Sequence, residues 1–128
     1  MLDASRNSLL YHKDSSFRIV AGLAGKGLSL QSINYPDRFI RHRGNLLYLE
    51  KKDKSKLFKG DASFLPRRGF TSTRKKFSMS FESVNKPGWF IRNSRYRLRI
   101  SKYERSTTFA KDASWVPSSK CTFKLLRN

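Results

Sequence analysis

This chain of 128 residues lacks disulfide pairs, long apolar runs and a recognisable leader. Its one cysteine, Cys121, has no partner for an intramolecular disulfide, and we expect it to be buried in a strand. No apolar run approaches the ~20 residues that a membrane-spanning helix needs, so no membrane span is predicted. The first residues also lack the basic region and apolar core that mark a secretory signal peptide. The sequence alone therefore leaves the compartment open.

Groups suited to catalysis are scarce. The chain has nine acidic residues and two histidines, and none of them stands in a metal-ligand spacing, a nucleophile elbow or a phosphate-binding loop. A glycosidase needs two carboxylates across the scissile bond, whereas the acids here lie mostly in repeated turn positions. The sequence therefore predicts a binding protein rather than an enzyme, with no metal and no cofactor.

Positive charge, in contrast, is abundant, because 28 lysines and arginines give a net charge of +19. This excess favours polyanionic partners such as nucleic acid, sulfated glycan or acidic cell-wall polymer, although no nucleic-acid-binding motif is present. A solvated face explains much of the charge equally well. The cations that would carry polyanion binding are Lys51, Lys52, Lys54, Lys56, Arg74, Lys75, Lys76, Arg95, Arg97 and Arg99. The last three alternate along one predicted strand, as a stripe of bidentate donors for sulfate or phosphate.

The chain also contains an internal repeat. Residues 29–66 align with residues 80–117 at a constant spacing of 51, with 15 of 38 positions identical. Each copy ends in a related tetrad, Asp-Ala-Ser-Phe at 61–64 and Asp-Ala-Ser-Trp at 112–115, and Asp-Ser-Ser-Phe occurs at 14–17. A repeated unit should repeat its surface site, so we look for functional residues at equivalent positions.

Alternation of apolar and polar residues predicts strands. Leu98 and Ile100 alternate with Arg97 and Arg99, and residues 77–82 and 121–125 show the same pattern. Turn signals occur at 34–37, 43–45, 66–69 and 85–88. No stretch shows helical periodicity, so we expect an all-β barrel or sandwich. Phe17, Phe64 and Trp115 are expected in its core, together with several of Phe39, Ile40, Phe90 and Ile91.

We read the chain as one domain, 1–128, with two full repeats and a partial third. The full repeats span about 27–76 and 77–118, the partial repeat about 8–26, and a closing strand about 120–126. A partner chain or a second copy of this chain is one way to complete the third repeat.

The repeated motif resembles a known family. The order Ser-x-x-Ser-[Ile/Val]-Asn-x-Pro-x-x-Phe-Ile-Arg-His, Leu-x-Leu and Asp-Ala-Ser-Phe is similar to the arabinofuranose-binding (AbfB-type) domain of α-L-arabinofuranosidases, a family 42 carbohydrate-binding module, over about residues 8–126. The resemblance implies a β-trefoil, an extracellular location and a separate catalytic domain. It also implies one furanose side chain of a hemicellulose in each unit, held by His42 and Asp61 in the first, by Asn93 and Asp112 in the second, and by Asp14 in the third.

Three other interpretations stay open. The repeated aspartates would also serve as structural caps that accept backbone N–H bonds, and His42 would also fit a solvated basic turn. A second interpretation is a polyanion-binding β-trefoil whose sugar pockets have decayed and whose basic clusters bind the polyanion. A third interpretation is a truncated or structural remnant that folds only with a partner chain.

Overall fold

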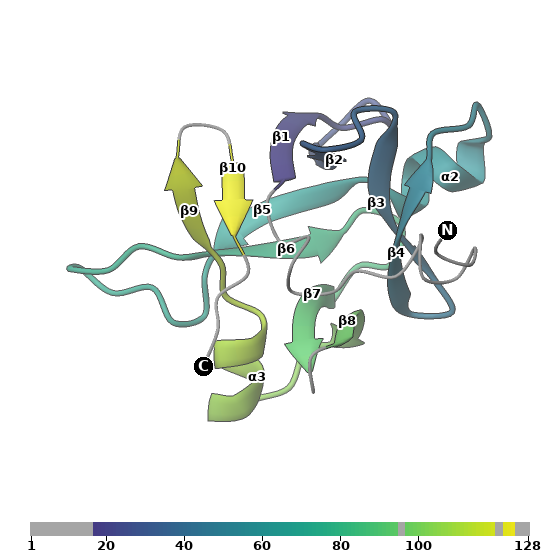
Figure 1. Ribbon diagram of the computed structural model, residues 1–128. Helices are drawn as coiled ribbons and strands as arrows, with labels where there is room; N and C mark the ends of the chain where they lie inside the picture. Colours follow the sequence, from purple (N-terminus) through teal and green to yellow (C-terminus); the bar gives the residue numbers. More distant parts are fainter. Residues whose placement is uncertain (1–16, 95–96, 120–121, 125–128) are drawn as a thin grey trace.

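The strands of this computed structural model form an antiparallel barrel (Figure 1). The structure describes residues 17–94, 97–119 and 122–124. In chain order the elements are β1 (Phe17–Ala21), β2 (Leu28–Ser32), β3 (Arg38–Arg43), β4 (Leu46–Lys51), α2 (Lys56–Asp61), β5 (Phe64–Arg68), β6 (Met79–Ser83), β7 (Trp89–Ser94), β8 (Arg97–Lys102), α3 (Thr107–Asp112), β9 (Val116–Ser119) and β10 (Thr122–Lys124). The connection between β5 and β6 projects away from the barrel (Figure 1).

Seven strands close the barrel in the order β2–β3–β4–β8–β7–β6–β5, and β5 pairs with β2 again. Two residue pairs complete the ring: Leu46 opposite Arg99 between β4 and β8, and Leu28 opposite Phe64 between β2 and β5. β1, β10 and β9 continue from β2 outside this ring.

The all-β prediction is confirmed, but the predicted β-trefoil is wrong. A trefoil needs three equivalent four-stranded units, whereas this barrel is a closed ring of seven antiparallel strands drawn from two units. Since β4 of the first unit pairs directly with β8 of the second, no place remains between them for a third hairpin. The described strands that we assigned to a third unit, β1 and β10, instead pair with each other beside the ring.

The repeat is visible in the strand register. The β3–β4 and β7–β8 hairpins have equivalent pairings, Arg38 opposite Lys51 and Trp89 opposite Lys102, each shifted by 51 residues. The predicted turn at 43–45 is a hairpin turn in which Gly44 and Asn45 have positive φ, as a two-residue connection between twisted strands requires.

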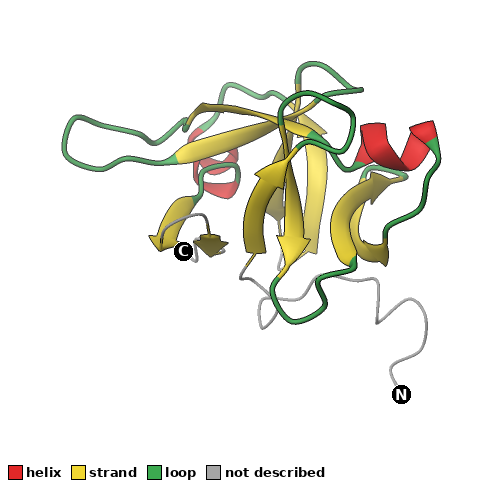
Figure 2. Ribbon diagram, turned by 90° about the horizontal axis from the view of Figure 1, so that it is seen from above, coloured by secondary structure: helices red, strands yellow, loops and turns green. Residues whose placement is uncertain are grey.

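Two local predictions are wrong. Residues 66–69 do not form a turn, because Pro66 lies within β5 opposite Phe81 of β6. Two helices, α2 and α3, were also missed, since six residues are too few to show a helical period. Each begins after a serine, Ser55 or Ser106, whose hydroxyl accepts a hydrogen bond from a backbone N–H three residues later at 3.0 Å. Both helices lie on the outside of the strands (Figure 2).

The core fills the barrel as the alternation predicted. Leu98 and Ile100 are buried while Arg97 and Arg99 are only half-buried. The main cluster contains Phe17, Leu28, Leu30, Ile40, Leu47, Leu49, Phe64, Phe81, Ile91, Leu98, Ile100 and Trp115. Phe39 and Phe90 belong to two smaller clusters beneath α2 and α3. The expected core positions are therefore confirmed, whereas Cys121 lies outside the described residues.

The Asp-Ala-Ser-Phe tetrad ties the end of a helix to the barrel. The hydroxyl of Ser63 donates to the carbonyl of Lys59 at 2.8 Å, and the carbonyl of Ala62 accepts from Ser29 of β2 at 2.6 Å. The second unit repeats both bonds at 2.7 Å. Because the serines that form these bonds are buried in both units, losing one partner would leave a buried polar atom unpaired. The alanine, serine and aromatic positions of the motif are thus explained by folding.

Candidate functional site

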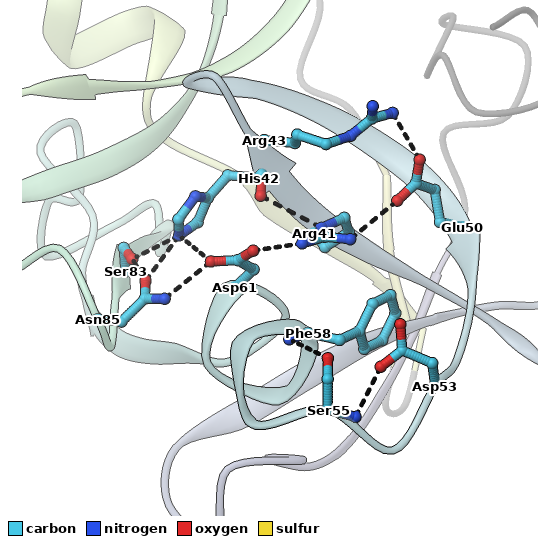
Figure 3. Close-up of polar contacts among 10 residues, drawn as sticks. All are labelled: Arg41, His42, Arg43, Glu50, Asp53, Ser55, Phe58, Asp61, Ser83 and Asn85. Atoms are coloured by element: carbon cyan, nitrogen blue, oxygen red, sulfur yellow. Dashed lines mark hydrogen bonds and ion pairs between the residues drawn. The ribbon is translucent and has the colours of Figure 1, made fainter.

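An arginine on a barrel strand holds the aspartate at the end of each helix. Arg41 of β3 donates through Nη2 to Asp61 Oδ2, at the last residue of α2, and through Nη1 to Glu50 Oε1 at 3.1 Å (Figure 3). The side chains of Arg41 and Asp61 are only 11% and 7% exposed. We call the Arg41–Asp61 pair, and its counterpart in the second unit, the clamp.

The surroundings of Arg41 keep it charged. Burial alone lowers the pKa of Arg41, but hydrogen bonds and charge from Asp61 and Glu50 raise it above its ordinary value. Its guanidinium also lies 5.0 Å from the centre of the Phe58 ring of α2. Within the described residues, the Asp61 side chain thus accepts from side chains, and not from the backbone N–H groups expected of a cap.

His42 follows the clamp arginine and joins the same network. Its Nε2 lies 2.7 Å from Asn85 Oδ1, 3.2 Å from Ser83 Oγ and 3.6 Å from Asp61 Oδ1 (Figure 3). Asn85 donates its Nδ2 to Asp61 Oδ1 at 2.8 Å. Its Oδ1 is therefore the acceptor for His42, and Nε2 carries the imidazole proton.

Burial is the main cause that lowers the pKa of His42 below its ordinary value, against the opposing effects of Asn85 and Asp61. The ring is therefore neutral near pH 7. With the proton on Nε2, Nδ1 is an acceptor, and it makes no hydrogen bond within the described residues.

These groups border an open hollow of about 450 Å³, which we call the His42 hollow. It is lined by Arg41, His42, Arg43, Gly44, Asn45, Leu57, Asp61 and Lys86. Lys86 comes from the second unit, donates to Asn45 Oδ1 at 2.6 Å and lies over the Trp89 ring. The structure thus brings the predicted pair His42 and Asp61 together, at a place where two units meet.

The second unit has the clamp but a different neighbourhood. Arg92 donates to Asp112 at 2.6 Å and lies 3.7 Å from Glu104, with its guanidinium 5.1 Å from the centre of the Phe109 ring. Asn93, at the position of His42, has a buried Oδ1 without a hydrogen-bond partner among the described residues, and the same holds for the Nε of Arg92. Of the two residues predicted for this unit, Asp112 is part of the clamp, and Asn93 follows the clamp arginine in the sequence.

The residues predicted to bind polyanions fall into two groups. Two arginines of the predicted stripe are half-buried: Arg97 donates to the carbonyls of Leu47 and Leu98 at 2.9 Å, and the Nε of Arg99 is buried. The exposed members are Lys51, Lys52, Lys54, Lys56, Arg74, Lys75 and Lys76. Asp14 and Arg95 lie outside the described residues.

Sequence analysis missed Ser83, Asn85 and Lys86 as neighbours of His42. Asn85 is one of the identical repeat positions, matching Asn34, but its role depends on a contact between units that the repeat itself does not reveal. Among the described residues no group of histidine, cysteine and carboxylate side chains could hold a metal ion. In the same residues no helix is long and apolar enough to cross a membrane.

Comparison with known proteins identifies the family. The model of the Alpha-L-arabinofuranosidase B (ABFB) domain matches residues 2–117. Alpha-L-arabinofuranosidase B of Emericella nidulans is 30% identical over 127 residues, covering 90% of this chain and 25% of that protein. Probable alpha-L-arabinofuranosidase B of Aspergillus fumigatus is 36% identical over 99 residues, covering 74% of this chain and 19% of that protein. This chain thus spans a quarter or less of the length of these relatives.

Solved structures agree on the fold. A GH54 α-L-arabinofuranosidase soaked with a cyclic sulfate inhibitor matches with a TM-score of 0.61 and 22% identity, covering 89% of this chain and 22% of that one. An arabinofuranosidase complexed with arabinofuranosyl-alpha-1,2-xylobiose matches with a TM-score of 0.60, at the same identity and coverage. Because the family model covers most of the sequence, this chain belongs to the alpha-L-arabinofuranosidase B (ABFB) domain family.

Proposed function

We propose that this domain is a non-catalytic carbohydrate-binding module, and that the His42 hollow holds an arabinofuranose-type side chain of hemicellulose or a related glycan. The observation that carries the proposal is the juxtaposition of a buried carboxylate and a buried imidazole at the edge of an open hollow. Membership of a domain family of arabinofuranosidases supports a glycan as the partner.

The hydrogen bonds left over at the hollow suit sugar hydroxyls. A carboxylate has about four acceptor sites, and Asp61 uses its two oxygens for one bond each from Arg41 and Asn85. Together with Nδ1 of His42, this leaves acceptors for the hydroxyl protons of a neutral ligand. The nearby carboxylates of Asp61 and Glu50 are both held by Arg41, an arrangement suited to holding a ligand rather than to proton transfer.

In the second unit we propose a weaker site at Asn93 and Asp112. The buried Oδ1 of Asn93 offers one acceptor, but no residue equivalent to Asn85 braces it within the described part of the chain. A third site at Asp14 remains a prediction from the sequence.

The test is calorimetric binding of arabinoxylan and L-arabinose at roughly 0.5 M salt, which screens exposed charges. Asp61→Asn keeps the shape of the side chain but removes its charge. We expect it to weaken binding about tenfold or more, as loss of a charged hydrogen bond does. The matched variant Asp112→Asn should retain most of the affinity. Unchanged binding by Asp61→Asn would contradict the assignment of the site.

Polyanion binding is the second candidate, favoured by one observation. All ion pairs in the described residues are formed by arginine or histidine, and none by lysine. The exposed lysines at positions 51, 52, 54 and 56 therefore carry charge that no carboxylate of the described residues neutralises. An acidic or sulfated glycan would fit such a surface.

Salt separates the two candidates. Heparin binding through these lysines should fall steeply between 0.05 and about 0.5 M salt, because counterions are released. Replacing the four lysines with glutamine should make the affinity for heparin depend less steeply on salt concentration. Replacing Arg74, Lys75 and Lys76 with glutamine tests the projecting connection between β5 and β6 in the same way. If arabinoxylan is released along with heparin at high salt, the charged surface is the binding site and the His42 hollow is not.

A further inference from the structure

A second hollow lies between α3 and the connection from β5 to β6, and it shares no residue with the His42 hollow. It measures about 470 Å³ and is lined by Phe70, Thr71, Tyr103, Glu104, Arg105, Ser106, Thr107, Phe109 and Ala110. We call it the aromatic hollow. It lies at the start of α3, whereas the equivalent of the His42 hollow would lie at the end of that helix.

The floor of the aromatic hollow is a packed group of rings. Tyr103 lies 5.3 Å from Phe70 with the rings tilted by 32°, and 5.5 Å from Phe109 with the rings nearly perpendicular. Phe70 also packs edge-on against Phe90 and Phe109. Phe109 is fully buried, yet Tyr103 remains 49% exposed. The neighbouring rings therefore hold Tyr103 in place while leaving a broad aromatic surface in water.

The first unit shows that the fold does not require these aromatic residues. Lys52 and Tyr103 are equivalent, since their backbone N–H groups donate to the carbonyls of Asp37 and Gly88, both at 2.9 Å. Leu23 and Phe70 are equivalent because each donates its N–H to a matched serine hydroxyl. At the two matching positions near α2 the chain has a lysine and a leucine, so the paired aromatics are found only beside α3.

Polar groups surround the rings. The side chain of Glu104 is 59% exposed, Arg105 and Thr107 are exposed, and the hydroxyl of Thr71 bonds to Ser78 at 3.1 Å. An aromatic floor with a few hydrogen-bonding groups at its rim matches one face of a pyranose in the chair form. When its hydroxyls are equatorial, the axial C–H bonds of such a ring make a flat apolar face, while the hydroxyls point outward to the rim.

We propose that the aromatic hollow binds a pyranose ring of the main chain of the same polysaccharide whose furanose side chain enters the His42 hollow. This inference rests on the proposed function, since it assumes that the partner is a branched glycan. It assigns backbone recognition to the second unit and side-chain recognition to the first. The linear oligosaccharide β-1,4-xylohexaose is a suitable probe because it carries no furanose.

The first experiment maps both sugars by NMR on the 15N-labelled chain at roughly 0.5 M salt. Xylohexaose should shift the amide signals of residues 70–71 and 103–107 and leave those of 42–45 unchanged. L-Arabinose should do the reverse. If arabinose shifts residues 42–45 while xylohexaose shifts nothing near Tyr103, this inference is overturned and the proposed function stands. If neither sugar binds, both are overturned.

The second experiment uses substitutions at one exposed ring. Tyr103→Lys introduces the residue of the first unit and should weaken xylohexaose binding roughly fivefold to tenfold, whereas Tyr103→Phe should retain it. Tyr35→Lys changes a tyrosine that is 54% exposed and lies outside the hollow, so it should have no effect. Equal losses in Tyr103→Lys and Tyr35→Lys would overturn the inference. Should Tyr103→Lys fail to fold, the NMR map of the unsubstituted chain still decides.

Discussion

In the first unit the guanidinium of Arg41 lies between Asp61 and Glu50, and His42 beside it bonds to Asn85 of the following unit. In the second unit Arg92 binds Asp112 in the same way, but the buried Oδ1 of Asn93 beside it has no hydrogen-bond partner in the part of the chain that the structure describes. The clamp is thus common to both units, while its surroundings differ. The shared clamp therefore belongs to the fold of both units, and the units differ at the position that follows the clamp arginine, His42 in the first and Asn93 in the second.

The largest expected effect tests whether the clamp is structural in both units. Asp61→Ala and Asp112→Ala should each lower the free energy of unfolding by about 3 kcal/mol, because each leaves a buried arginine without its close carboxylate. Unfolding by denaturant measures the free energy of unfolding of each variant. Asp37→Ala is the control, since Asp37 is exposed and its side chain makes no hydrogen bond within the described residues. It should change stability by less than about 0.5 kcal/mol.

If Asp112→Ala proved neutral while Asp61→Ala did not, the clamp would be a feature of the first unit alone. The clamp would then not be a structural feature common to both units.

The alternation of apolar and polar residues made several strands predictable, but neither the two short helices nor the assembly of the strands. Strand alternation placed Leu98 and Ile100 in the core, and the resemblance placed His42 with Asp61, which lie 3.6 Å apart. The seven-stranded ring could not be read from the sequence, because it depends on β4 meeting β8 across a sequence distance of about one repeat. Asn85 was missed for the same reason. The stripe of alternating arginines correctly indicated a strand, but Arg97 is occupied with backbone carbonyls.

A smaller effect tests the contact between the units. Asn34 and Asn85 are equivalent and both are exposed, but only Asn85 forms side-chain hydrogen bonds within the described residues. Asn85→Ala should lower the free energy of unfolding by about 1 kcal/mol and release His42 from its tautomer. Asn34→Ala should change stability by less than about 0.5 kcal/mol. Unfolding curves and the imidazole 15N shifts of His42 measure the two effects.

Equal changes in the free energy of unfolding in Asn34→Ala and Asn85→Ala would show that the hydrogen bonds of Asn85 do not stabilise the fold. An unchanged His42 spectrum in Asn85→Ala would mean that another group fixes the tautomer.

The smallest effect is a pH dependence that only the first unit should have. The pKa of His42 is lowered in the folded state, chiefly by burial, so at pH values below about 6.5 the unfolded chain binds more protons than the folded chain. The free energy of unfolding should therefore rise with pH up to about 6.5 and then level off. His42→Asn, which introduces the residue of the second unit, should flatten this rise.

The matched control for that pH profile is His12→Asn, which changes the only other histidine in the chain. The difference between the profiles of the unsubstituted chain and His42→Asn reports on the imidazole of His42, and His12→Asn shows what loss of a histidine elsewhere does. Parallel profiles between pH 5 and 7.5 would mean that His42 is not held neutral by burial. The affinity for arabinose should also decrease as the pH is lowered through this range, because protonation of His42 removes the acceptor at Nδ1. A pH-independent affinity would separate sugar binding from His42 and leave Asp61 as the only polar anchor of the pair.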